Sequence, residues 1–151
     1  MPIMRICVYS MWRMIMAMII DVDAFLQALA EPTRLRVLML LNREKVLCVC
    51  ELTAALDVSQ PKMSRHLAAL RALDIVEDAR LANRVFYRLH PGLPGWALGV
   101  LHGLAEGMVA ASGFAAVQRR LHEFPNRPRQ RASFVCGGDR DQGRKETCHA
   151  V

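Results

Sequence analysis

The hydrophobic positions of this chain recur mostly at the three- and four-residue spacing of amphipathic helices. This spacing predicts helices over residues 22–30, 32–43, 51–56, 60–73 and 95–121. Two shorter runs, residues 75–79 and 85–89, are rich in β-forming side chains, and Asn83 between them suits a turn. We therefore expect a mainly α-helical domain with one small β-hairpin.

The third and fourth predicted helices are separated by only three residues, 57–59. A short helix, a tight turn and a longer helix form a helix-turn-helix, and Ser59 is placed to cap the longer helix. In that helix Met63, Leu67 and Leu70 fall at i, i+4 and i+7, which leaves the opposite face polar. The hairpin that follows predicts a wing, so the expected fold is a winged helix-turn-helix.

Length and composition fit one domain with flexible ends, since the chain has 151 residues and 53% of them are hydrophobic. We expect a poorly ordered N-terminal extension (1–20), a DNA-binding and dimerisation domain (21–121) and a disordered basic tail (122–151). The net charge of +6 lies in the two ends, because residues 21–118 carry ten basic and ten acidic side chains. The prediction of DNA binding must therefore rest on the positions of individual basic side chains and not on the net charge.

The five cysteines do not resemble the disulfide framework of a small secreted domain, because they are odd in number and widely spaced. Free thiols in a reducing cytoplasm are the simpler interpretation. The apolar run at residues 14–20 is far too short to span a bilayer, so no membrane role is expected. Several methionines in the first 18 residues lead to the hypothesis that translation starts internally.

Seven side chains on the predicted recognition helix and wing are candidate DNA contacts. They are Gln60, Lys62, Ser64, Arg65, His66, Arg80 and Arg84. Gln and Arg suit bidentate contacts to adenine and guanine, whereas arginines on a wing most often bind phosphates. His66 lies at the edge of the apolar face, which favours half-buried packing or a phosphate contact over metal binding. The alternative is an ordinary solvated helix face.

Cys48 and Cys50 immediately precede the helix-turn-helix and are candidate ligands for a soft metal ion. In an α-helix residues i and i+2 point about 200° apart, so both thiolates reach one ion only if the start of the helix unwinds. Unwinding there would move the recognition helix and supply a two-state switch. The alternative is that both cysteines are small buried hydrophobes.

Several ordered motifs resemble the ArsR family of winged-helix metalloregulatory repressors, specifically its arsenic-responsive branch. They are Glu31-Pro32-Thr33-Arg34-Leu35-Arg36, Cys48-Val49-Cys50-Glu51-Leu52, Ser59-Gln60-Pro61-Lys62-Met63-Ser64-Arg65-His66-Leu67 and Val85-Phe86-Tyr87-Arg88-Leu89. The resemblance implies a homodimer that binds palindromic operator DNA, represses transcription, and is released when As(III) or Sb(III) binds the cysteine thiolates. No resident cofactor is expected.

The chain departs from the family pattern where members with a full trigonal sulfur site have a third cysteine. That position is Thr53, and a hydroxyl is a poor ligand for a soft ion. The third contact is then expected from Cys7, Cys136, Cys148 or a cellular thiol. A zinc site on the last helix is not expected, because His102 has no histidine partner ten to twelve residues later.

Two other functions stay open at this point. A repressor of the same fold could sense cadmium, lead or oxidants through Cys7 with the cysteine pair, although soft divalent ions usually need more thiolates. A thiol-based redox enzyme would use Cys48 as a nucleophile, but no Cys-x-x-Cys motif or thiol-activating loop accompanies it. The sequence therefore predicts a DNA-binding regulator and not an enzyme.

Overall fold

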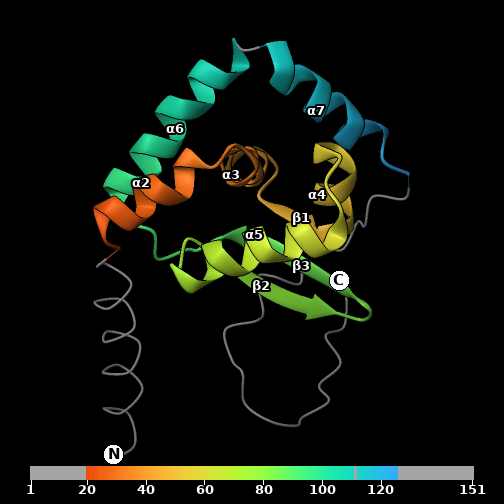
Figure 1. Ribbon diagram of the computed structural model, residues 1–151, viewed down its shortest axis with the longest axis horizontal. Coiled ribbons are helices and arrows are strands. Elements are labelled where there is room, and N and C mark those ends of the chain that lie inside the picture. The colour runs from red at the N-terminus through yellow and green to blue at the C-terminus, as the bar shows by residue number, and fades with distance from the viewer. Residues whose placement is uncertain (1–19, 111, 126–151) are drawn as a thin grey trace, which may run out of the picture.

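The computed structural model describes residues 20–110 and 112–125 (Figure 1). The elements are α2 (Val22–Ala30), α3 (Pro32–Glu44), β1 (Val46–Cys48), α4 (Val49–Leu56), α5 (Gln60–Ala72), β2 (Val76–Leu81), β3 (Arg84–Leu89), α6 (Gly95–Val109) and α7 (Ser112–Glu123). This part of the chain is mainly helical with one small sheet, and α4, α5 and the β2–β3 hairpin form a winged helix-turn-helix. The predicted fold class is confirmed.

The corner between α2 and α3 is held by local hydrogen bonds. Glu31 is the N-cap of α3, and its carboxylate accepts the backbone N–H of Arg34 at 2.7 Å. The Arg34 guanidinium in turn donates to the carbonyl oxygens of Ala28 and Gln27, each at 3.0 Å. Pro32 starts the helix at a position where no backbone donor is needed. These contacts orient α2 relative to the core.

Helix α3 lies at the centre of the molecule, where Figure 1 shows it nearly end-on beneath α6 and above α5 and the sheet. Its residues Val37, Leu38, Met39, Leu40 and Leu41 are all almost completely buried. Because consecutive residues of α3 are buried all round the helix, it serves as the core to which the other elements are attached.

The sheet has three antiparallel strands in the order β1-β3-β2, one more than the predicted hairpin. Strand β1 pairs with β3 so that Cys48 lies opposite Phe86. All three β1 residues are buried, so the alternation of apolar and polar positions that marks a half-exposed strand is missing. The hairpin turn is also shorter than predicted, since only Ala82 and Asn83 separate β2 from β3.

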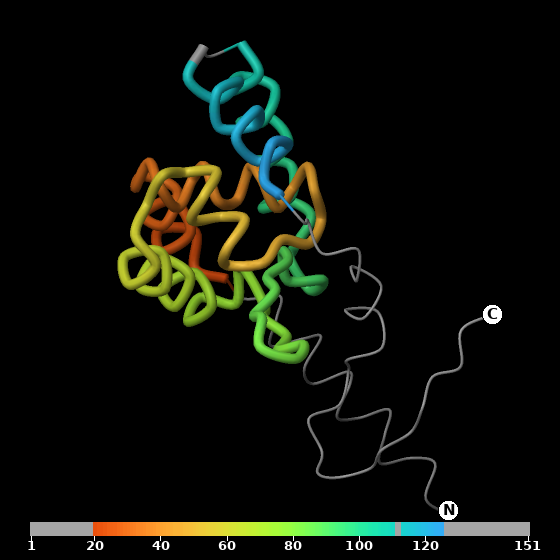
Figure 2. The backbone as a smooth tube through the Cα atoms, turned by 90° about the vertical axis from the view of Figure 1, so that its right-hand side faces the viewer, coloured from red at the N-terminus to blue at the C-terminus, as the bar shows by residue number. Residues whose placement is uncertain are grey.

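The prediction of one long helix over residues 95–121 is wrong. Two helices, α6 and α7, occupy this stretch and are bent by 96° relative to each other, so that they arch over α3 (Figures 1 and 2). Helix α6 ends at Val109 with Ala110 as its C-cap, and α7 begins at Ser112. Beyond it, Phe114, Val117 and Leu121 are buried and α7 lies against α4. Burying each such side chain contributes about 1.5–3 kcal/mol, which outweighs the helical bonds lost at the break.

The predicted N-terminal extension, apart from residue 20, and the basic tail beyond residue 125 lie outside the described residues. Over residues 20–110 and 112–125, no single helix has the length and hydrophobicity needed to cross a membrane, and only α6 and α7 together, as a bent pair, pass such a test.

Candidate DNA-binding face and cysteine pair

Helix α5 has one buried and one exposed face, as its sequence predicts. Met63, Leu67 and Leu70 are completely buried against the core. Four predicted DNA contacts, Gln60, Lys62, Ser64 and Arg65, are exposed in the first two turns. The N-terminal turns of a recognition helix are the part that meets base edges in the major groove. The structure therefore leaves these side chains accessible, and their contacts with DNA stay a prediction.

The start of α5 differs from the prediction in one detail. Ser59 is the N-cap residue, but its side chain makes no capping hydrogen bond. Pro61 occupies one of the first helical positions and has no N–H to satisfy. Ser59 and Gln60 are both exposed, so the polar start of this helix faces outward together with the candidate contacts.

The wing places Arg80 and Arg84 near the tip of the hairpin. Both side chains are exposed, on neighbouring strands beside the turn in which Ala82 has a left-handed φ of 54°. Two other basic residues are already engaged, because Arg71 pairs with Asp78 at 3.1 Å and Arg88 pairs with Glu77. Those pairs attach the wing to α5 and join its two strands.

Four of the exposed basic side chains of α5 and the wing are available for an external partner. Lys62, Arg65, Arg80 and Arg84 form no ion pair with any residue in the part of the chain that the structure describes. Exposed cations without local acidic partners are suited to phosphate oxygens and base edges.

His66 is less exposed than the other six predicted DNA contacts. Its side chain is 15% exposed, its Nδ1 lies 3.5 Å from the Glu31 carboxylate, and its Nε2 is buried without a hydrogen-bond partner among the described residues. Burial alone would raise the pKa of Glu31. Hydrogen bonds from the backbone of Arg34 and Thr33 and the charge of His66 lower this pKa by more than burial raises it, so it lies below the ordinary 4.5. His66 therefore links α5 to the α2–α3 corner, and a DNA contact by it stays a prediction.

Replacing Glu31 by glutamine should lower the free energy of unfolding by about 1 kcal/mol at neutral pH, because the helix cap loses its charged acceptor. The folded-state pKa of Glu31 is depressed, so its stabilisation is present above the unfolded value and is lost as the pH falls through the folded one. Urea unfolding at pH 7 and at successively lower pH should therefore show the difference shrinking. Glu106→Gln, which changes an exposed carboxylate of α6, is the control; a Glu31→Gln effect independent of pH would contradict this assignment.

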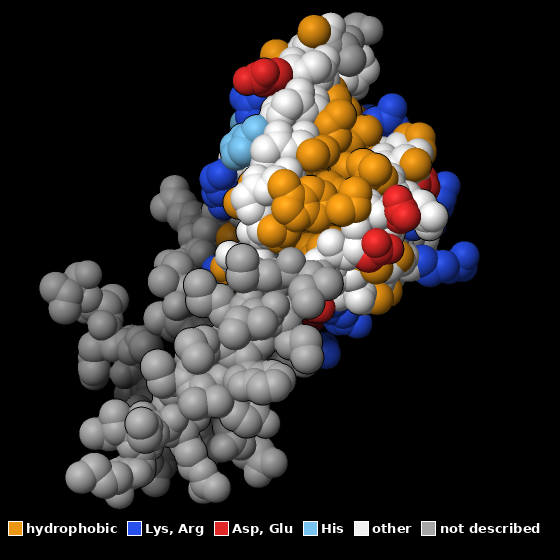
Figure 3. All heavy atoms as spheres, turned by 90° about the vertical axis from the view of Figure 1, so that its left-hand side faces the viewer, with side chains coloured by type: hydrophobic (Ala, Val, Ile, Leu, Met, Phe, Trp, Pro, Cys, Tyr) orange, Lys and Arg blue, Asp and Glu red, His pale blue; other side chains and the backbone are white. Residues whose placement is uncertain are grey.

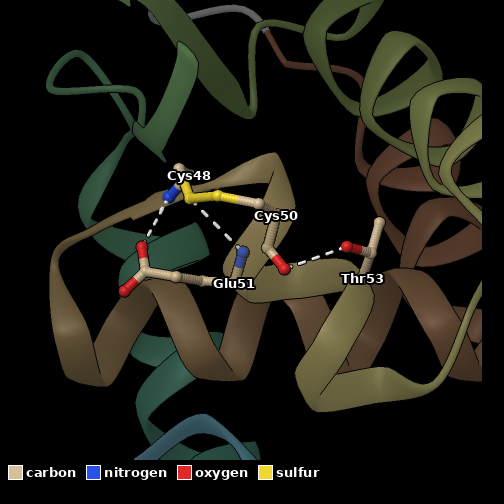
Figure 4. The surroundings of a disulfide bond; sticks show 4 residues. All are labelled: Cys48, Cys50, Glu51 and Thr53. Carbon is tan, nitrogen blue, oxygen red and sulfur yellow. Dashed lines mark hydrogen bonds between the residues drawn. A yellow bond between two sulfur atoms is a disulfide. The ribbon is translucent and has the colours of Figure 1, made fainter. Parts of the chain in front are cut away.

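Cys48 and Cys50 lie at the junction of β1 and α4 and are joined by a disulfide bond (Figure 4). Cys48 ends the strand and is the N-cap of α4 with extended backbone angles, φ −81° and ψ 160°. Only Cys50 lies inside the helix, so the two side chains converge. The expectation that the helix must unwind before the sulfurs meet is therefore wrong, because it placed both cysteines in helical geometry.

Glu51 is a structural partner of the pair that the sequence analysis missed. The Cys48 sulfur accepts the backbone N–H of Glu51 at 3.3 Å, and the Glu51 carboxylate accepts the backbone N–H of Cys48 at 2.8 Å. This reciprocal arrangement is a capping box, and Glu51 is only 1% exposed. The sequence does contain the signal for this capping box, because Glu51 is an acidic residue three positions after Cys48. The signal is easily overlooked because cysteine is an unusual N-cap.

Apolar residues of the sheet surround the cysteine pair. Cys48 is buried in one cluster with Val46 and Phe86. Cys50, Ala79 and Leu81 pack against that cluster. The pair therefore contacts the wing directly as well as leading through α4 into α5, which sequence spacing did not indicate.

The described residues place only two thiols at this site. Thr53, at the position of the family's third cysteine, donates its hydroxyl to the Cys50 carbonyl oxygen at 2.9 Å. No group of three or more His, Cys, Asp or Glu side chains suited to a metal ion occurs within residues 20–110 and 112–125. Cys7, Cys136 and Cys148 lie outside the described residues, so their predicted contribution stays a prediction.

Comparison with known proteins matches a family model described as bacterial regulatory protein, arsR family, to residues 31–78. This stretch contains the cysteine pair and all of α5. The arsenic resistance transcriptional regulator ArsR1 of Pseudomonas putida is 51% identical over 80 residues, which cover 53% of this chain and 62% of that protein, less than two thirds of its length.

Two further comparisons extend the similarity. The arsenic resistance transcriptional regulator ArsR2 of Pseudomonas putida is 48% identical over 121 residues, covering 79% of this chain and 100% of that protein. The crystal structure of the AntR antimony-specific transcriptional repressor matches with a TM-score of 0.51 and 33% identity, covering 60% of this chain and 79% of that one. The AntR structure shares the fold described above.

Proposed function

This chain belongs to the ArsR family of bacterial regulatory proteins, and from that membership we propose that it represses transcription by binding operator DNA in the cytoplasm as a homodimer. As(III) or Sb(III) releases it by binding Cys48 and Cys50. The family consists of regulators, so the thiol-enzyme alternative is discarded. The observation that carries the proposal is the convergence of both sulfurs at the start of α4, which leads directly into the recognition helix α5.

Inducer binding requires the reduced pair. A thiol reductant opens the Cys48–Cys50 disulfide, supplying two electrons and two protons and becoming a disulfide itself. Two As–S bonds then form, one to each thiol, and two As–O bonds of arsenious acid break. The two thiol protons leave with the released hydroxides as two molecules of water.

The bound ion acts on the start of α4. It would tie the Cys48 sulfur, which caps α4, to the Cys50 sulfur inside that helix, and Cys48 is also paired with Phe86 of the wing. Loss of a helix cap alone costs about 1 kcal/mol. Converting a mostly bound repressor to a mostly free one requires about 5 kcal/mol of preference for the DNA-free state. The wing and α5 together must therefore lose their DNA-binding geometry.

The homodimer is supported by an exposed apolar face on α2 and α6. Figure 3 shows hydrophobic side chains gathered over these helices. Val22, Leu26 and Trp96 are large hydrophobic residues with 51%, 49% and 40% of their surface exposed. Trp96 stacks edge-on against Phe25 with ring centroids 5.1 Å apart, which joins α2 and α6 into one surface. A second copy of the chain would cover this surface by a two-fold, self-complementary contact.

Leu26→Glu should convert the dimer to a monomer at micromolar concentration, because it puts a charge in the centre of the contact without disturbing the buried core. Analytical ultracentrifugation checks this, with Gln27→Glu, an exposed neighbour on α2, as the charge-matched control. A wild-type protein that sediments as a monomer and occupies one half-site would contradict the dimer.

The proposed function is tested by inducer-dependent release of DNA. The operator is first selected from random duplexes with the reduced protein, and its complex is then titrated with arsenite, antimonite, cadmium, lead and zinc. Release by arsenite or antimonite at the lowest concentrations supports the proposal. Retention of DNA at all concentrations of both ions would overturn it.

A further inference from the structure

The cysteine pair is bordered by groups that do not complete a three-thiolate site. On this basis, and resting on the function proposed above, we propose that the preferred inducer is a monosubstituted trivalent arsenical. Such a compound, R–As(OH)₂, carries one carbon substituent and therefore needs only two protein thiolates.

The oxygen groups nearest the sulfurs along the chain are already committed to the backbone. Figure 4 shows the Glu51 carboxylate and the Thr53 hydroxyl on either side of the disulfide, each turned to a backbone group. Their distances of 2.8 Å to the Cys48 nitrogen and 2.9 Å to the Cys50 oxygen are those of good hydrogen bonds. Hydroxyl and carboxylate oxygens are in any case poor ligands for a soft centre. Two thiolates are therefore the donor set that these residues provide.

Trivalent arsenic forms three bonds, and two of them go to Cys48 and Cys50. For arsenite the third position must hold hydroxide or a further thiol. For a monosubstituted arsenical the third bond is the carbon–arsenic bond that the molecule already has. The two-thiolate donor set therefore matches the second ligand without recruiting another group.

The surroundings also favour a carbon substituent. Cys48 is buried in a cluster with Val46 and Phe86, and Cys50, Ala79 and Leu81 pack against this cluster. A methyl or phenyl group on arsenic would therefore lie beside apolar side chains. A hydroxide in that position would lose hydrogen bonds to water. An anionic thiol such as glutathione would approach the buried Glu51 carboxylate, which is 1% exposed. Both ways of completing an arsenite site are disfavoured here.

The binding step is balanced without a change in oxidation state at arsenic. Once a reductant has opened the disulfide, two As–S bonds form and two As–O bonds break. Both thiol protons leave in two water molecules, and the As–C bond is unchanged. The bound protein should therefore gain the mass of R–As less two hydrogens, which intact mass spectrometry measures directly.

The test compares arsenite, methylarsonous acid and phenylarsine oxide as inducers of the full-length protein on its selected operator. A phosphine keeps the cysteines reduced, because a dithiol would itself chelate the arsenicals. Both organic compounds should release half of the DNA at about tenfold lower concentration than arsenite, equivalent to about 1.4 kcal/mol. If none of the three releases DNA, the proposed function fails; if arsenite acts at an equal or lower concentration, only the present inference fails.

Variants at position 53 provide a second measurement. Thr53 lies three residues after Cys50 on the same helix face, so Thr53→Cys adds a thiolate beside the pair. It should lower the arsenite concentration for release about tenfold and leave the response to methylarsonous acid unchanged. Thr53→Ser keeps the hydroxyl and should behave as wild type. An arsenite response unaltered by Thr53→Cys would overturn the inference, because it would mean that a third ligand is already supplied.

Discussion

Cys48→Ser and Cys50→Ser should each leave a repressor that binds its operator but is no longer released by arsenite. Either change removes one of two thiolates, and the remaining one cannot chelate the ion. The arsenite concentration for half-release should rise at least about 100-fold, equivalent to about 2.8 kcal/mol. Fluorescence anisotropy of a labelled operator measures both affinity and release.

The structure makes this experiment well controlled. A serine hydroxyl is a preferred N-cap, so Cys48→Ser can still accept the Glu51 N–H and hold the start of α4. Operator affinity without inducer should therefore stay within about 1 kcal/mol of wild type. Cys136→Ser and Cys148→Ser are the matched controls and should keep most of the response. Wild-type release from either core variant would move the inducer site away from the cysteine pair.

Arg65→Ala should weaken specific operator binding by about 1–3 kcal/mol and relax the base preference at one position. Arg65 is exposed in the second turn of α5 and forms no ion pair with the described residues, so its guanidinium is available for a guanine edge. Binding curves against the operator and single-base variants measure this effect.

Variants of two other arginines distinguish base-specific binding from nonspecific electrostatic binding to DNA. Arg84→Ala should weaken all sequences alike and reduce the slope of log affinity against log salt by about 1, because a wing arginine binds phosphate. Arg71→Ala, on the same helix as Arg65, breaks an exposed ion pair with Asp78 and should change affinity little. Unchanged specific affinity in Arg65→Ala would remove this residue from the recognition surface.

The parts of this fold that sequence predicts well are those set by local spacing. Met63, Leu67 and Leu70 fix which side of α5 is buried, and that fixes the exposure of Lys62 and Arg65. The charges of the wing follow in the same way from the alternation of the hairpin strands. These candidate contacts therefore needed no information from distant segments.

The parts that sequence did not predict depend on distant partners. Strand β1 exists because it pairs with β3, far along the chain, and three buried residues carry no periodic signal. Helix α7 separates from α6 because Phe114 and its buried neighbours pack on α4. The cysteine geometry was misjudged for the same reason, since pairing of Cys48 with Phe86 keeps it out of the helix.

The disulfide makes the oxidation state of a protein sample decisive for any measurement of induction. An arsenical and a direct S–S bond are mutually exclusive occupants of the same two sulfurs, while the oxidised pair still caps α4 and leaves α5 in place. On the function proposed above, protein oxidised at this pair would bind operator and not respond to an arsenical, so it would be mistaken for a constitutive repressor. In the cell, on the same proposal, oxidation of this pair would cancel the response to the metalloid, so oxidative stress and arsenic exposure would not be additive signals.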